Sequence, residues 1–175
     1  MGTTYVTRDG MRVKVSDQRE EPYLTCEAHA QGVAPKVYGA FETSDGKTVL
    51  VMENLDIGTL ERYLQSPRNQ EQDDKVDRAL VRLFRTYSRP VGESYVCHMD
   101  LHSGNIALRQ GANGTIEAKA IDWGVSEIVD RASTCNTEAF AGLFDDMYYI
   151  RRRMPLFAAL IDSDGHIRRD GNGEG

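Results

Sequence analysis

Three side chains with oxygen ligands follow one another at short spacing in the middle of the chain. The segment YVCHMDLHSGNIAL contains Asp100 and, five residues later, Asn105, and the segment AKAIDWGVSE contains Asp122. Asp100 can accept a proton from an incoming hydroxyl group, whereas the Asn105 amide oxygen and the Asp122 carboxylate are hard ligands suited to Mg²⁺. Phosphoryl transfer needs little besides such positioning and charge neutralisation. The spacing predicts a magnesium-assisted phosphotransfer site, although aspartates of this kind are also ordinary turn residues.

Both segments resemble motifs of protein kinases. Residues 98–105 (HMDLHSGN) are similar to the H-R-D-L-x-x-x-N catalytic loop, and residues 122–124 (DWG) are similar to D-F-G. Each motif alone is weak, so the resemblance rests on their order, their spacing and the predicted hairpin between them. It implies a two-lobed, kinase-like α+β fold in which Asp100 is the catalytic base and Asn105 and Asp122 bind Mg²⁺.

The first part of the chain predicts two β-hairpins. Asp-Gly turns at 9–10 and 45–46 separate runs of β-prone residues, and Asp-Gly supplies the backbone conformation of a tight turn. The four predicted strands lie at 5–7, 11–15, 36–43 and 48–55.

Lys14 lies on the second of these runs. By resemblance it takes the place of the kinase lysine that holds the nucleotide phosphates. A helix is predicted over 20–31, and the resemblance makes Glu27 the glutamate that pairs with this lysine, with Glu20 and Glu21 as alternatives. Without the downstream motifs, Lys14 would be interpreted as a solvent-facing strand residue.

The same resemblance predicts a binding site for ATP. Met52 stands in the gatekeeper position, and residues 53–55 form the hinge whose backbone groups would contact the adenine edge. The expected cofactors are ATP and Mg²⁺. The expected nucleotide-binding residues are Lys14, Met52, Glu53, Leu55, Ala107 and Ile121.

Helical periodicity dominates the remainder of the chain. Three helices are predicted, over residues 58–65, 74–87 and 138–154. A polar connector at 66–73 separates the first two. The expected organisation is a reduced N-terminal lobe with hinge (1–55), a truncated helical lobe carrying the catalytic loop (56–161) and a disordered tail (162–175).

Two departures from the kinase pattern stand near Lys14. No G-x-G-x-x-G loop precedes it, which predicts weak nucleotide binding. Arg12 replaces the small apolar residue that packs on adenine in kinases, and strand alternation puts it on the same face as Lys14. No long activation segment and no A-P-E motif follow residue 124. This outline resembles the minimal kinase-like effectors that bacteria inject into host cells and the truncated kinases of large DNA viruses.

Composition narrows the classes of partner. The 175 residues carry a formal net charge of −6 without a long basic stripe, so a nucleic acid is not expected. No apolar run is long enough to span a membrane, and the expected location is the cytoplasm, with the cytoplasm of a host cell as an alternative. Cys26, Cys97 and Cys135 are odd in number and widely spaced, which favours reduced thiols.

Three functions remain open from the sequence. The first is a compact Ser/Thr-type protein kinase that acts with or on a regulatory or substrate protein. The second is a kinase-derived binding module, weakly active or inactive, that sequesters or mimics a host protein. The third is a small-molecule kinase, because D-L-H-x-x-N around His102 is closer to that group than to typical protein kinases.

Overall fold

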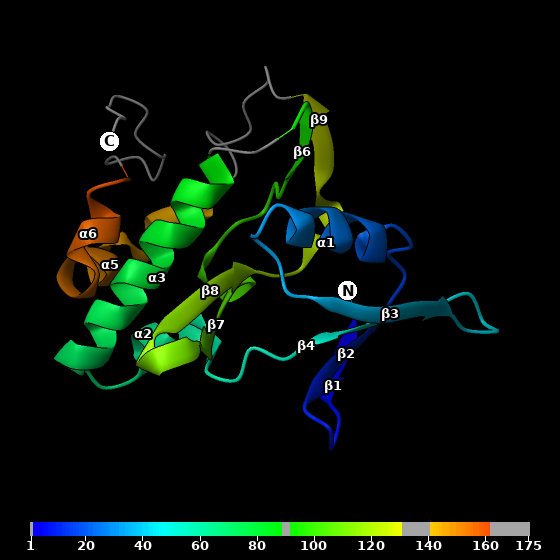
Figure 1. Cartoon of the computed structure of the whole chain (residues 1–175), viewed down its shortest axis with the longest axis horizontal. Coiled ribbons are helices and arrows are strands. Elements are labelled where there is room, and N and C mark those ends of the chain that lie inside the picture. The colour runs from blue at the N-terminus through cyan, green and yellow to red at the C-terminus, as the bar shows by residue number, and fades with distance from the viewer. Residues whose placement is uncertain (1, 89–91, 131–140, 162–175) are drawn as a thin grey trace.

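The computed structural model describes residues 2–88, 92–130 and 141–161. These residues form a mixed α+β structure, with a four-stranded sheet at one end and a group of helices at the other (Figure 1). The tail predicted at 162–175 lies outside the described residues. Within the described ranges, no helix combines the length and the apolar character that a membrane crossing requires.

The N-terminal sheet is antiparallel and has the strand order β1-β2-β4-β3. Both predicted hairpins are confirmed, because Gly10 (φ +80°) and Gly46 (φ +85°) supply the left-handed conformation that the Asp-Gly turns need. The register places Arg12 opposite Met52, and Lys14 projects from the same face of β2. The strands are β1 (Thr3–Val6), β2 (Met11–Ser16), β3 (Val37–Glu42) and β4 (Thr48–Glu53).

Helix α1 (Glu21–Ala30) connects this sheet to the rest of the molecule. Pro22 lies in its first turn, where a missing backbone N–H leaves no hydrogen bond unmade. Leu24 and Ala28 are buried in the main hydrophobic core. One face of α1 therefore packs on the C-terminal half while its first turn stays beside β2.

The helical half encloses the main hydrophobic core. The rings of Phe84 and Phe157 lie 4.7 Å apart in this core, and Trp123 is fully buried there. A buried ion pair between Arg153 of α5 and Asp73 of α3, 2.9 Å apart, connects these two helices. The helices are α2 (Leu60–Gln65), α3 (Gln70–Ser88), α5 (Met147–Arg153) and α6 (Pro155–Ala158).

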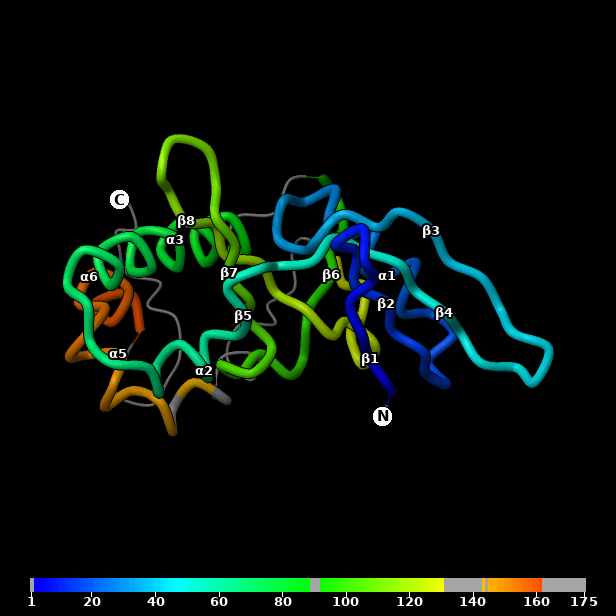
Figure 2. Tube along the Cα trace, turned by 90° about the horizontal axis from the view of Figure 1, so that it is seen from below, coloured from blue at the N-terminus to red at the C-terminus, as the bar shows by residue number. Residues whose placement is uncertain are grey.

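Two small sheets lie between the helices and the N-terminal sheet. One has the order β5-β7-β8 and the other pairs β6 with β9. Figure 2 shows β5 and β7 between the helical half and the N-terminal sheet. Asp100 follows β6, Asn105 directly precedes β7 and Asp122 follows β8, so the small sheets present these residues at the junction of the two halves. The strands are β5 (Gly58–Thr59), β6 (Ser94–Cys97), β7 (Ile106–Gln110), β8 (Ile116–Ala120) and β9 (Glu127–Asp130).

Three helix predictions need correction at their boundaries. Helix α3 begins at Gln70 instead of residue 74, because the Asn69 side chain accepts a hydrogen bond from the Gln72 amide (3.1 Å) and caps it. Helix α2 begins at Leu60, after Thr59 accepts from the Arg62 amide at 3.2 Å.

The helix predicted over 138–154 is instead a 3₁₀ segment (Ala141–Asp146) followed by α5. The tighter 3₁₀ turn still lets Leu143 and Met147 both enter the core. Residues 138–140 lie outside the described residues.

Candidate active site

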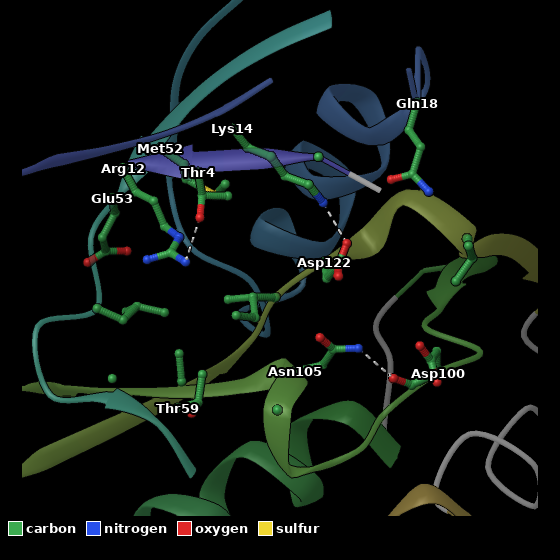
Figure 3. A pocket seen from close by; sticks show the side chains of 17 residues that line it. Thr4, Arg12, Lys14, Gln18, Met52, Glu53, Thr59, Asp100, Asn105 and Asp122 are labelled. Atoms are coloured by element: carbon green, nitrogen blue, oxygen red, sulfur yellow. Dashed lines mark hydrogen bonds and ion pairs between the residues drawn. The ribbon is translucent and has the colours of Figure 1, made fainter. Parts of the chain in front are cut away.

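A cavity of about 470 Å³ lies between the N-terminal sheet and the small sheets (Figure 3). Of the residues predicted to bind nucleotide or metal or to act in catalysis, all but Glu27 line it. They come from β2, from the end of β4 and the segment after it, from the loop between β6 and β7, from β7 itself and from the segment after β8. The residues concerned are Lys14, Met52, Glu53, Leu55, Asp100, Asn105, Ala107, Ile121 and Asp122.

Lys14 reaches from β2 to two carboxylates. Its Nζ lies 2.8 Å from Glu21 Oε2 and 2.5 Å from Asp122 Oδ1, a residue 108 positions further along the chain. Burial alone would lower the pKa of Lys14, but the hydrogen bonds to Asp122 and Glu21 outweigh it and raise this pKa above 10.5. The ammonium is therefore charged and directed at the motif that follows β8.

The glutamate beside Lys14 is Glu21, so the expected pairing with Glu27 is wrong. Glu21 is only 2% exposed, whereas Glu27 faces solvent. The reason is helical phase: the buried side of α1 carries Glu21, Leu24 and Ala28 at helical spacing, and Glu27 lies off that side. The spacing of Glu21, Leu24 and Ala28 is present in the sequence, but it selects Glu21 only once the side of α1 that packs on the core is known.

Asp122 occupies a constrained position. Its backbone is left-handed (φ 66°, ψ 61°), a conformation that costs on the order of 1–3 kcal/mol for a residue other than glycine. The flanking contacts hold it there, because the Ile121 amide donates to the Asn105 carbonyl (2.8 Å) and the Trp123 indole donates to the Ala120 carbonyl (2.7 Å). The carboxylate is directed into the cavity toward Lys14 (Figure 3).

His98 links the two motifs through hydrogen bonds. The sequence motif alone did not predict this role. It is fully buried, and its backbone amide donates to the Tyr87 hydroxyl at 2.6 Å. Its Nε2 lies 2.6 Å from the Ile121 carbonyl and its Nδ1 accepts from the Asp100 amide at 3.2 Å. Burial lowers the pKa of His98, which favours the neutral ring. Because Nδ1 accepts from the Asp100 amide, the hydrogen bonds assign the proton of the neutral ring to Nε2, which faces the Ile121 carbonyl. One side chain thus sets the positions of residues 100 and 121 together.

Asp100 presents its carboxylate at the open rim of the site. Its side chain is 59% exposed and lies 3.8 Å from His102 Nε2. The residue before it, Met99, is also left-handed (φ 71°), so both motif aspartates are at or beside a strained position. The Asp100 carbonyl accepts a hydrogen bond from the Asn105 side-chain amide at 2.9 Å.

This hydrogen bond fixes the orientation of the Asn105 side-chain amide. With its nitrogen on Asp100, the amide oxygen of Asn105 points into the cavity on the side of Asp122 (Figure 3). An amide oxygen and a half-exposed carboxylate are donors that Mg²⁺ accepts. The described residues hold no group of three or more histidine, cysteine or acidic side chains that would bind a metal alone. The donors fit Mg²⁺ held jointly by this pair and by phosphate oxygens.

The predicted hinge is braced by a contact that the sequence did not reveal. Glu53 pairs with Arg109 of β7, and its carboxylate also accepts from the Lys36 amide at 3.2 Å. The Glu53 amide in turn donates to the Lys36 carbonyl at 2.9 Å. The contacts of Glu53 therefore connect the end of β4 to β7 and hold together the end of the cavity that lies beside the predicted hinge.

The fold and this arrangement of a lysine, a glutamate and the three motif side chains of Asp100, Asn105 and Asp122 define a kinase-like protein. Residues 23–144, more than half of the chain, match the family model of the ABC1 atypical kinase-like domain. The chain belongs to this family. Comparison with individual curated proteins gives no match.

Proposed function

We propose that this protein transfers a phosphoryl group from ATP to a hydroxyl group in the presence of Mg²⁺. The observation that carries the proposal is the convergence of Lys14, Glu21 and Asp122, which joins the N-terminal sheet to the second motif at 2.8 and 2.5 Å. Asp100 and Asn105 line the same cavity. Membership of a kinase-like family supports the same reaction class.

Each of these residues has a separate role in the proposed reaction. Lys14 holds phosphate oxygens, and Asn105 and Asp122 hold Mg²⁺, which neutralises phosphate charge when it is bound. Asp100 accepts the proton of the acceptor hydroxyl as its oxygen forms the new bond to the γ-phosphorus. The bond from that phosphorus to the bridging oxygen breaks, and ADP keeps the electron pair.

For the acceptor we propose a serine or threonine of a protein that acts with this chain or on it. The exposure of the Asp100 side chain, 59%, supports this choice because a hydroxyl on a large partner can reach an open rim. A small-molecule acceptor is the alternative for the same site.

A catalytically weak binding module is the second candidate function. It is favoured by the 2.5 Å contact between Lys14 and Asp122, since a metal ion must compete with the ammonium for that carboxylate. In this case nucleotide binding would stabilise a scaffold for a partner protein, without turnover.

Thermal unfolding with and without Mg·ATP tests the proposal. Binding to the folded state at about 100 times the Kd stabilises it by about 2.7 kcal/mol, so the wild-type Tm should rise by several degrees. Asp122→Ala should abolish the part of this rise that depends on Mg²⁺. A wild-type Tm that does not change when millimolar Mg·ATP is added would refute nucleotide binding. A rise without phosphate transfer to itself or to added protein would favour the binding module.

A further inference from the structure

Arg12 brings a second cation into the cavity, and the reaction above does not use it. Arg12 and Lys14 both line the cavity because they are alternate residues of β2. The register places Arg12 opposite Met52, toward the base-binding end, while Lys14 contacts Asp122 at the other end. Figure 3 shows the Arg12 side chain reaching from the strand into the cavity, on the Glu53 side of Lys14.

The guanidinium of Arg12 is weakly bonded. Its one hydrogen bond among the described residues goes to the Thr4 hydroxyl, at 3.4 Å, and it makes no ion pair there. A guanidinium carries five N–H donors, so most of its capacity is open to a ligand. The nearby carboxylate of Glu53 is already engaged by Arg109 and by the Lys36 amide.

Lys14, in contrast, has its charge balanced by Glu21 and Asp122 at 2.8 and 2.5 Å. The uncompensated positive charge of the cavity therefore belongs to Arg12. Phosphate is the ligand that matches it, since a planar guanidinium can bind two phosphate oxygens through parallel hydrogen bonds.

We propose that Arg12 binds the phosphate nearest the nucleoside and makes this cavity selective for nucleotides over nucleosides. The inference rests on the nucleotide-binding function proposed above. Arg12 lies between the predicted hinge and Lys14. A nucleotide with its base at Met52 and its outer phosphates at Lys14 would therefore have its first phosphate beside the Arg12 guanidinium.

Calorimetric titration with adenosine, AMP and Mg·ADP tests this role of Arg12. Arg12→Ala should weaken AMP and ADP binding roughly ten- to a hundredfold and leave adenosine unchanged, because one charge-assisted contact is lost. Arg12→Lys should restore part of the loss, since it keeps the charge but not the fork. Arg8→Ala is the matched control: Arg8 is an exposed cation in the turn of the same hairpin, and its loss should change none of the three affinities.

Several results would overturn the inference. If Arg12→Ala loses affinity for adenosine and AMP equally, Arg12 contacts the base and not the phosphate. If Arg12→Ala binds all three ligands more tightly, Arg12 only occupies space in the cavity. Unchanged AMP and ADP binding by Arg12→Ala would remove the role of Arg12 and leave the proposed function standing. A wild-type protein that binds none of the three would remove both. Should Arg12→Ala fail to fold, Arg12→Gln provides the same comparison with side-chain length kept.

Discussion

The helical half and the N-terminal sheet are held together in different ways. The main hydrophobic core draws on α1, on the helices of the C-terminal half and on the small sheets, but on no residue of β1 to β4. Strand β3 is exposed along nearly its whole length, and Phe41 on it is 60% exposed. The loop that carries Asp100 and Asn105 therefore rests on a packed core, whereas Lys14 and Arg12 lie on a sheet that contributes nothing to that core.

This difference assigns a specific task to α1. Its Leu24 and Ala28 belong to the main core, while Glu21 at its start holds Lys14. Packing against the core keeps the part of the site around Asp100 in place. A small number of ion pairs attaches to it the part on the N-terminal sheet, which would bind nucleotide. Mutations in the two regions should consequently have different signatures.

The largest effect is expected for Asp100→Asn, which should lower the rate of phosphate transfer by about 10²- to 10⁴-fold. Stability should change little, because the side chain is 59% exposed and it is the backbone of Asp100 that bonds to His98 and Asn105. Phosphate transfer and thermal unfolding measured on the same samples check this. Asp9→Asn, in the exposed turn of the first hairpin, is the control. A variant that loses stability along with activity would contradict the separation of chemistry from packing.

Asp73→Ala should destabilise the helical half by about 3–5 kcal/mol. Asp73 is fully buried and bonds to Arg153 (2.9 Å) and to the Tyr63 hydroxyl (2.6 Å), so its loss leaves a buried guanidinium without its anion. Urea unfolding measures the change in free energy. The neighbouring Asp74→Ala removes an exposed carboxylate and should stay within about 0.5 kcal/mol. Similar losses for both variants would show that the ion pair between Asp73 and Arg153 does not hold the helices together.

Glu21→Gln should cost about 1–3 kcal/mol because it removes a buried ion pair, and it should weaken nucleotide binding because Glu21 holds the Lys14 ammonium in position. Glu27→Gln on the exposed side of α1 should change stability by no more than about 0.5 kcal/mol. Denaturant unfolding and nucleotide titration of the pair separate the two glutamates. An equal or larger effect at Glu27 would restore the pairing predicted from the sequence.

The smallest effects, about 1.4 kcal/mol per unit of pKa difference, should appear in the pH dependence of stability. The folded state raises the pKa of Lys14 above 10.5, so its contribution is complete below pH 10.5 and is lost as the pH rises through the folded value. It lowers the pKa of His98 below 6.5, so that contribution is complete above pH 6.5 and is lost as the pH falls through the folded value.

Unfolding free energies measured across pH should therefore show an alkaline loss that Lys14→Met removes and an acid loss that His98→Gln removes. Either loss surviving its own substitution would assign it to another group.

The motif that carries the chemistry was predictable because its parts are close in sequence. Asp100 and Asn105 follow a strand within one loop, and Asp122 follows the hairpin that returns beside it, so local turn chemistry places all three. The two N-terminal hairpins were predictable for the same reason. Helix boundaries were less predictable, because caps such as Asn69 act through single hydrogen bonds that a polar segment offers at several positions.

The contacts that complete the site were beyond the sequence. Choosing Glu21 over Glu27 required knowing which side of α1 packs on the core, and the brace between Glu53 and Arg109 joins segments that no local pattern relates.

Residue types and short spacings by themselves predicted a magnesium-assisted phosphotransfer site with three oxygen-bearing side chains, and the resemblance to kinases added the lysine expected to serve them. Only the tertiary structure decided which glutamate meets that lysine, that a buried neutral His98 couples the two motifs, and that Arg12 stays without an anion among the described residues. The physical reason is that charge pairing and burial depend on distances across the fold, and those are set when α1 and the sheet pack against the core.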